Sequence, residues 1–247
     1  KKMISPAGIK QLVFLVLCLF HVSSWAQVNT TGKITYERRT NLMKRYNDPR
    51  MKRFVNEDNK IKNEEFTLTF NDSISYFKPV PTNTVDEMAW MTTKNQYYQF
   101  LNQEKQVSIL SIFGQDIYIR DSLPARPWKI TDSKRVINGY NCRKAVYQKN
   151  DSTRIYAWYT TSITPSVGPE GFCGLPGLIM GIATEDGGII YFAKKVELLE
   201  SIPAETFKID LGKNKYYTML EFRAKIEKEY GNTPWGKRLF GDLFRWL

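Results

Sequence analysis

The sequence predicts an α+β fold dominated by antiparallel β-structure, with a curved or half-barrel-like sheet and two or three helices. Three observations lead to this prediction. Short segments rich in aromatic and β-branched residues recur along most of the 247-residue chain. Polar breaks and turn residues separate these segments. Well-defined helical spacing of apolar residues is confined to the C-terminal part of the chain.

The first strand is expected from Gly32 onward. Ile34, Tyr36 and Arg38 alternate there with more polar residues, which is the period of a strand with one buried face. Residues 41–54 are basic and only weakly helical, so they predict a break before the next strand.

A hairpin follows. Residues 66–70 and 74–76 both alternate with a period of two, and the turn residues 71–73 lie between them. Residues 79–87 are polar and contain two prolines, which predicts a long loop. Further strands are expected over residues 95–101, 107–112, 117–120, 141–149 and 154–160.

The last part of the chain combines a second hairpin with helices. Residues 178–184 and 189–198 flank the sequence Glu-Asp-Gly-Gly, a strong hairpin signal because glycine accepts a positive φ without steric cost. Residues 219–230 form an expected amphipathic helix that Gly231 ends. Residues 234–247 have apolar side chains at helical spacing and predict one more helix.

The N-terminal segment, residues 1–26, has the three parts of a secretory signal peptide. Basic residues precede an unbroken apolar run over residues 12–20, which is too short to span a bilayer comfortably. Ser24 and Ala26 then supply the small residues of a cleavage site. We therefore expect an exported protein in which residues 27–247 form a single β-rich domain.

Export changes the counts that decide which chemistry is available. The full chain has a net charge of +11, three cysteines and one histidine. Cleavage would remove three lysines and no acid, leaving +8, and would also remove Cys18 and His21. Without histidine, the Ser-His-Asp and Cys-His arrangements of most secreted hydrolases cannot form. The two remaining cysteines, Cys142 and Cys173, favour a disulfide in an exported protein, with two free thiols as the alternative.

One hexapeptide and its surroundings resemble a known family. Gly174, Leu175, Pro176, Gly177, Leu178 and Ile179 spell GLPGLI. Upstream of them lie Trp128-Lys129-Ile130, Lys134, Ile137, Gly139-Tyr140, Cys142, Lys144-Ala145, Trp158-Tyr159-Thr160, Pro165 and Gly168-Pro169. The stretch from about Trp128 to Leu199 resembles the GLPGLI family of secreted bacterial envelope proteins. The resemblance implies an envelope location and a β-rich fold, and it assigns no catalytic residues. Cys173 departs from the family pattern and offers a partner for Cys142.

The hexapeptide has two interpretations. Pro176 fixes φ at about −65° and Gly177 accepts a positive φ, which together suit a type II turn. The three apolar residues of the motif would then anchor the turn in the core. In the alternative, the loop over residues 165–177 presents Phe172 and Leu175 outward to a partner.

Paired carboxylates are the remaining groups for acid–base chemistry. They are Glu64-Glu65, Asp86-Glu87 and Glu185-Asp186. We expect these pairs in loops or at strand edges, where most charged residues are simply solvated. Sequence spacing cannot bring distant carboxylates to the ~5–9 Å separation that a glycosidase mechanism needs.

Basic residues gather in the stretch 38–62. A solvated face is one interpretation of this stretch. Attraction to an anionic membrane surface or to an acidic protein is the other, and both fit an exported protein better than nucleic-acid binding does.

These observations predict a non-enzymatic periplasmic accessory protein that docks on an outer-membrane protein or transporter, without cofactor or metal. It would be peripheral at the outer membrane. The candidate contact residues are Phe172, Leu175, Phe240, Phe244, Trp246 and Leu247. A carrier of lipid or acylated cargo with an apolar groove is the second hypothesis. A carboxylate-dependent hydrolase, with two carboxylates in one cleft, is the third.

Overall fold

The computed structural model describes residues 29–46, 53–83, 85–112, 114–150, 153–209, 214–233 and 236. The expected signal peptide and the candidate contact residues Phe240, Phe244, Trp246 and Leu247 lie outside the described residues. No helix within these ranges is long and apolar enough to cross a membrane.

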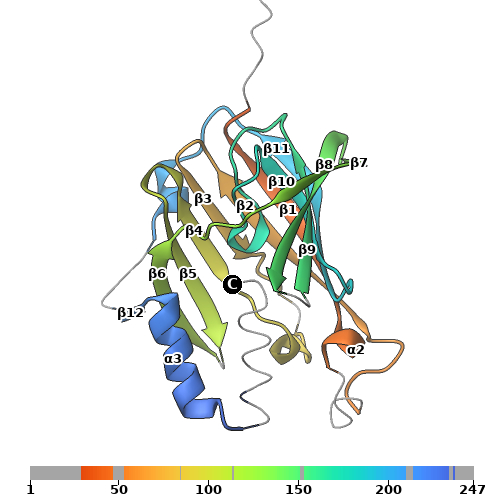
Figure 1. Ribbon diagram of the computed structural model, residues 1–247, viewed down its shortest axis with the longest axis vertical. Helices are drawn as coiled ribbons and strands as arrows, with labels where there is room; N and C mark the ends of the chain where they lie inside the picture. Colours follow the sequence, from red (N-terminus) through yellow and green to blue (C-terminus); the bar gives the residue numbers. More distant parts are fainter. Residues whose placement is uncertain are drawn as a thin grey trace, which may run out of the picture.

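The described chain forms twelve strands, two α-helices and four short 3-10 helices (Figure 1). The strands are β1 (Gly32–Asn41), β2 (Ile61–Phe70), β3 (Ile74–Pro79), β4 (Gln96–Phe100), β5 (Lys105–Ile112), β6 (Gln115–Ser122), β7 (Lys129–Ile137), β8 (Tyr140–Asn150), β9 (Thr153–Thr160), β10 (Leu178–Thr184), β11 (Ile189–Leu198) and β12 (Tyr216–Tyr217). The helices are α2 (Leu42–Arg45), α3 (Met219–Tyr230), η1 (Ala89–Met91), η2 (Leu101–Gln103), η3 (Pro169–Gly171) and η4 (Ala204–Phe207).

All twelve strands belong to one curved, open sheet (Figure 1). Its order is β12-β6-β5-β4-β3-β2-β1-β11-β10-β9-β8-β7, so β1 joins the strands of the first half to those of the second. Every pairing between these strands is antiparallel except the short parallel pairing of β12 with β6, and an isolated parallel bridge joins Asn29 to Ile163. The β-rich α+β prediction is therefore confirmed at the level of fold class.

One face of the sheet, which we call the inner face, carries the main core. On it β1, β2, β3, β4 and β11 place the aromatic side chains Tyr36, Phe66, Phe77, Tyr97 and Tyr191, all fully buried. These rings pack in edge-to-face, tilted or stacked pairs, with centroids between 5.1 and 6.4 Å apart. The segment that contains η3 lies over this face and contacts β3, β4 and β10 (Figure 1).

Two smaller clusters cover the β4–β6 side of the sheet. Helix α3 packs Phe222 and Ile226 against β5 and β6. A capping box between Thr218 and Glu221 begins this helix, and Gly231 ends it, as the sequence predicts. On the outer face, Phe207 of η4 covers the stacked rings of Tyr76 and Tyr98.

Most expected strands are present, and β7 is the main one that the sequence did not predict. The turn that joins β10 and β11 forms as expected, with Gly187 at φ 65°. Strand β7 lies at the end of the sheet and exposes most of its side chains, so its sequence KITDSKRVI lacks an apolar alternation. Of the weakly helical stretch after β1, the structure describes residues 41–46 and 53–54, and Leu42–Arg45 among them form helix α2.

Candidate functional site

A gap opens in the sheet beside the first half of β2. Strand β3 pairs with Phe66–Phe70 of β2 and ends at Pro79, opposite Phe66. One more main-chain bond follows, from the Val80 N–H to the Glu65 carbonyl. The chain then leaves β2 and returns to the sheet only at Gln96, after a connection that is long for a compact domain. In the part of the chain that the structure describes, residues 61–64 of β2 thus have β1 on one side and no strand on the other.

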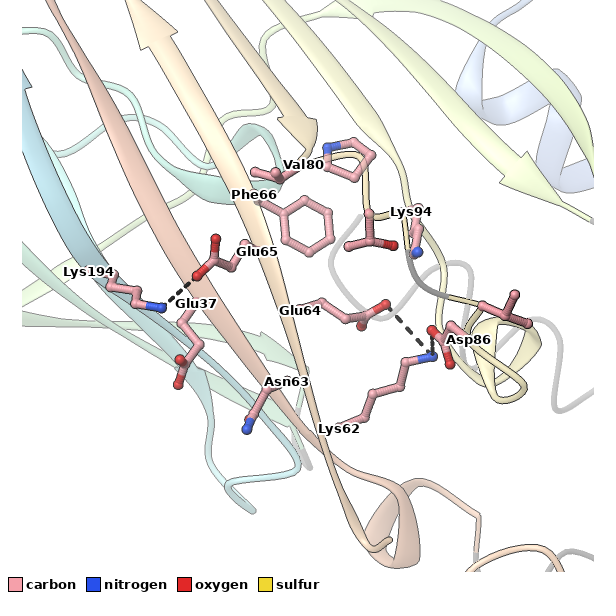
Figure 2. Close-up of a pocket in the computed structure, with 13 residues that line it drawn as sticks. Glu37, Lys62, Asn63, Glu64, Glu65, Phe66, Val80, Asp86, Lys94 and Lys194 are labelled. Carbon is pink, nitrogen blue, oxygen red and sulfur yellow. Dashed lines mark hydrogen bonds and ion pairs between the residues drawn. The ribbon is translucent and has the colours of Figure 1, made fainter.

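A cavity of about 550 Å³ fills this gap, and Figure 2 shows the side chains around it. Lys62, Glu64 and Asp86 gather on one side of β2, whereas Glu65 and Lys194 meet on the other (Figure 2). The remaining lining residues are Glu37, Asn63, Phe66, Pro79, Val80, Thr82, Val85 and Lys94. The cavity is therefore polar, with both signs of charge and a small apolar wall.

Lys62 holds the loop that borders the cavity. Its ammonium group lies 2.7 Å from Asp86 Oδ2 and donates a hydrogen bond of 2.6 Å to the Met88 carbonyl. Burial acts to raise the pKa of Asp86, but the hydrogen bond and the charge of Lys62 outweigh it. The pKa of Asp86 consequently lies below its ordinary value, and the carboxylate stays ionised at neutral pH.

Glu64 connects the cavity with a buried ion pair. Arg38 on β1 donates to Glu64 Oε2 from Nη2 at 2.5 Å and from Nε at 3.1 Å. The other carboxylate oxygen accepts from the Thr92 hydroxyl at 2.9 Å and lies 3.9 Å from Lys62 Nζ. Both oxygens of Glu64 are thus engaged. The Arg38 guanidinium also lies 4.6 Å over the Phe66 ring, a favourable cation–π distance.

Glu170 of η3 is a second carboxylate on the same guanidinium. Its Oε1 lies 3.7 Å from Arg38 Nη1 and accepts a hydrogen bond from the Tyr191 hydroxyl. Among the described residues its Oε2 has no partner of good hydrogen-bond geometry, although the Tyr97 hydroxyl is close enough to affect the carboxylate. Burial raises the pKa of Glu170, against the opposing effects of Arg38 and the two tyrosines. Its backbone is left-handed, with φ 54°.

The segment of residues 165–177, which contains η3 and which we call the plug, packs on the inner face of the sheet. The Gly171 carbonyl accepts hydrogen bonds from Gln99 at 2.9 Å and from Arg126 at 3.3 Å. Phe172 is fully buried between Arg126, which lies 4.2 Å from its ring centroid, and Trp128. The alternative interpretation, in which Phe172 and Leu175 face outward, is wrong, because both side chains pack inside the sheet.

The GLPGLI hexapeptide forms a buried turn. Leu175, Leu178 and Ile179 join the main core, as the first interpretation requires. The turn is tighter than type II, because the Gly177 N–H donates to the Leu175 carbonyl two residues earlier, at 2.8 Å. Gly177 has φ 134°, and a Cβ added to it would lie 2.1 Å from the Thr160 carbonyl oxygen.

The cysteines do not form the expected disulfide: Cys142 and Cys173 are both buried free thiols. Cys142 on β8 lies in the main core cluster and approaches the Tyr140 carbonyl. Cys173 instead faces the Pro124 carbonyl in the plug. An even number of cysteines does not show that two of them lie close together, and these two side chains make different contacts. Burial raises the pKa of Cys142 to about 11 and also raises that of Cys173.

The carboxylate pairs suggested by the sequence lie in different parts of the structure. Glu64, Glu65 and Asp86 all line the cavity, although two of them come from β2 and the third from the loop after β3. Glu185 forms an exposed ion pair with Arg154, far along the sheet order from β2. Across the described ranges, no group of three or more His, Cys, Asp or Glu side chains could hold a metal ion.

Arg38 and Glu170 are the site residues that sequence reasoning missed. A signal for Arg38 was present, because it continues the buried alternation of Ile34 and Tyr36. A cation in such a position needs a buried partner. Glu170 offered no comparable signal, since only the folded plug brings it to β1 and β11.

The comparisons with known proteins give a family match over a short stretch and a likeness of fold. A family described as "Protein of unknown function (Porph_ging)" matches residues 148–181, which include the hexapeptide. This match is compatible with the resemblance to the GLPGLI family. No curated protein sequence matches the chain.

Two solved structures of PNGF-II, in the P21 and C2 space groups, have a similar fold. Each superposes with a TM-score of 0.55, at 16% and 17% sequence identity respectively. The match covers 79% of this chain and 32% of the PNGF-II chain, so the protein corresponds to about a third of PNGF-II. At this identity the likeness concerns the fold alone.

Proposed function

We propose that the protein is a non-enzymatic accessory protein of the periplasm that docks on an outer-membrane protein or transporter through the cavity beside β2. The observation that carries the proposal is the interruption of the sheet at Pro79, which leaves main-chain and charged side-chain groups facing a cavity of about 550 Å³. Exposed strand edges are surfaces on which proteins recognise other chains. A permanent gap within a sheet therefore suits recognition.

The chemistry of the cavity supports docking over a carboxylate-dependent hydrolase. Such an enzyme needs two carboxylates free to act at one cleft. Glu64 has both oxygens engaged by Arg38, Thr92 and Lys62. Glu170 is only 1% exposed and is not among the residues that line the cavity.

The plug supports docking over a lipid carrier. A carrier of lipid or acylated cargo would use the concave inner face as an apolar groove. Phe172 and Leu175 occupy that face, and they are held by hydrogen bonds to Gly171 on the same segment. Cargo would have to displace these buried side chains.

Affinity purification with a cavity-blocking variant tests the proposal. Thr82 lines the cavity and is exposed, so Thr82→Trp fills part of it without entering the core. Val136→Trp, on the exposed side of β7, is the matched control. We expect wild type and control to recover the same envelope protein in stoichiometric amount from solubilised membranes, and Thr82→Trp to lose it. Recovery of the wild-type protein alone, or unchanged recovery by Thr82→Trp, contradicts the proposal.

Attachment to an anionic membrane surface is a second candidate role, favoured by one exposed aromatic pair. The rings of Phe54 and Trp90 meet edge-to-face at 5.7 Å, and the side chains are 45% and 59% exposed. The Arg53 guanidinium lies 4.7 Å over Phe54. Aromatic rings beside cations are typical of protein surfaces at lipid headgroups.

Vesicle sedimentation tests this second role. The protein should sediment with phosphatidylglycerol-containing vesicles and not with pure phosphatidylcholine vesicles, and added salt should weaken binding. Trp90→Ala should reduce sedimentation, whereas Val136→Ala should not. Equal sedimentation with both kinds of vesicle, or no loss in Trp90→Ala, excludes this role.

A further inference from the structure

The backbone of β2 beside the cavity has a definite polarity. In an antiparallel ladder, alternate residues direct both main-chain groups to the same neighbour. The Glu65 carbonyl accepts from Val80, so Glu65 faces the β3 side. By the same alternation Asn63 and Ile61 also face that side, whereas Lys62 and Glu64 face β1. Pro79, which has no N–H, lies at a position where none is needed.

The main-chain groups of Ile61 and Asn63 therefore point into the gap. Within the described ranges, no backbone partner reaches them from the β3 side, because β3 pairs no further than Phe66. Asn63 is exposed and lines the cavity. A strand that entered here would lie along the line that β3 leaves, with pairing groups already in place.

The side chains that line the gap indicate which side chains an added strand would need. On the outer face Lys194 is 2.6 Å from Glu65, and neighbouring Glu37 has no ion pair within the described part of the chain. A basic side chain on that face would complement Glu37. On the inner side half-buried Pro79, which lies opposite Phe66, supplies an apolar contact. Because side chains of a strand alternate between faces, a basic residue next to an apolar one meets both walls.

We propose that the cavity receives its partner as an added β-strand: an extended peptide segment, with a basic residue next to an apolar one, that pairs with the main chain of Ile61 and Asn63. This inference rests on the proposed docking function and specifies its mode. Two to four main-chain hydrogen bonds would then supply much of the affinity, and Glu37 and Pro79 would supply the selectivity.

A backbone substitution isolates this mode. Asn63→Pro removes the one N–H of residue 63, which the ladder with β1 does not use, and edge positions of a sheet tolerate proline. Asn63→Ala removes only the side chain and keeps the N–H. The probe is a phage-displayed library of random nonapeptides selected on wild-type protein, from which single peptides are synthesised and titrated by fluorescence anisotropy.

The expected result has three parts. Selected peptides carry a basic residue next to an apolar one, Asn63→Pro weakens their binding about tenfold or more, and Asn63→Ala changes it by less than about threefold. If Asn63→Pro does not fold by circular dichroism, amide hydrogen exchange on wild type decides instead. The Ile61 and Asn63 amides should exchange more slowly when peptide is bound.

Other outcomes overturn strand addition. Failure to select any peptide contradicts it, as does peptide binding that Asn63→Pro leaves unchanged without protection of the two amides. Self-association of the wild type that Asn63→Pro abolishes would assign the gap to a second copy of the chain. The docking function is judged separately, because Thr82→Trp blocks the cavity whatever the mode of binding.

Discussion

Glu170 combines three unfavourable features in one residue. Its left-handed backbone is uncommon for a residue with a side chain and costs on the order of 1–3 kcal/mol. Its carboxylate is buried, and Oε2 has no hydrogen bond of good geometry. Arg38 and Tyr191 compensate only Oε1. The packing of the surrounding plug must therefore stabilise Glu170 in a backbone conformation and an environment that are unfavourable for this residue.

The raised pKa of Glu170 predicts a pH dependence of stability. The folded protein binds this proton more tightly than the unfolded chain does, so the resulting stabilisation is present below the ordinary pKa of 4.5 and is lost as pH rises through the folded pKa. Glu170→Gln lacks this titration. Its stability relative to wild type should therefore increase from about pH 4 to about pH 8 in urea unfolding. The exposed Glu185→Gln is the control, and a flat or falling difference for Glu170→Gln contradicts the prediction.

Gly177 is required by both its dihedral angle and its surroundings. Gly177→Ala should destabilise by more than ~2 kcal/mol, because the new methyl group would collide with the Thr160 carbonyl at a positive φ. Gly139→Ala is the matched control. Gly139 also has a positive φ, of 80°, but its Cβ would meet no atom within 4 Å, so about 1 kcal/mol is expected. Equal losses in urea unfolding would show that contact with Thr160 is unimportant.

At the scale of elements, the loop between β9 and β10 behaves as part of the core. Leu175→Ala should cost ~2–5 kcal/mol, because it leaves a cavity in the main cluster. Leu220→Ala on α3 serves as the control, since Leu220 is 78% exposed and should change stability by less than about 0.5 kcal/mol. A stable Leu175→Ala protein that fails to bind its partner would instead revive the contact interpretation.

Local signals explain which elements could be predicted. Helix α3 matches its expected range, because Thr218, Glu221 and Gly231 form caps that act within a few residues. Strand β7 could not be predicted, since an end strand without a buried face has no periodic apolar pattern. The turn type at Gly177 was not predicted either, because the adjoining Leu178 N–H bonds the carbonyl of Ile163, a contact between separate segments that no local pattern indicates.

At the scale of the whole molecule, the two buried thiols report global unfolding. Cys142 lies in the main core and Cys173 in the plug, and burial raises the pKa of both, so little reactive thiolate is present. Neither should react with iodoacetamide at pH 8 in the native protein. We expect residues 27–247 to unfold as one cooperative domain, so both cysteines should react without reductant over one urea transition.

Peptide mass spectrometry checks this labelling. Reaction of Cys173 at lower urea than Cys142 would mean that the plug opens before the sheet. Resistance of both residues in high urea until reductant is added would mean that they form a disulfide after all.

The candidate site depended on topology more than on motifs. In the sequence, Lys62 and Asp86 resemble ordinary surface charges, because no local sequence pattern indicates that the loop after β3 returns to the side of β2. Arg38 could have been identified from its place in the alternation of β1. The pairing of Arg38 with Glu170 could not, since it joins two segments only through the curvature of the sheet and the position of η3.

Pro79, which ends β3, also separates residues that the sheet constrains from residues of the connection that are free to change. Residues before Pro79 and after Gln96 are tied to neighbours in the sheet, so most changes there disturb folding. The intervening connection contacts β2 through Lys62, the Val80 main-chain bond and the Thr92 hydrogen bond to Glu64, and its residues Met91 and Thr92 are buried. Insertions or exchanges in its exposed part, near Thr82 and Val85, would reshape the recognition surface while leaving the scaffold intact. Because Pro79 ends β3 before this connection, chains with this fold would be able to bind different partners without a change in the sheet.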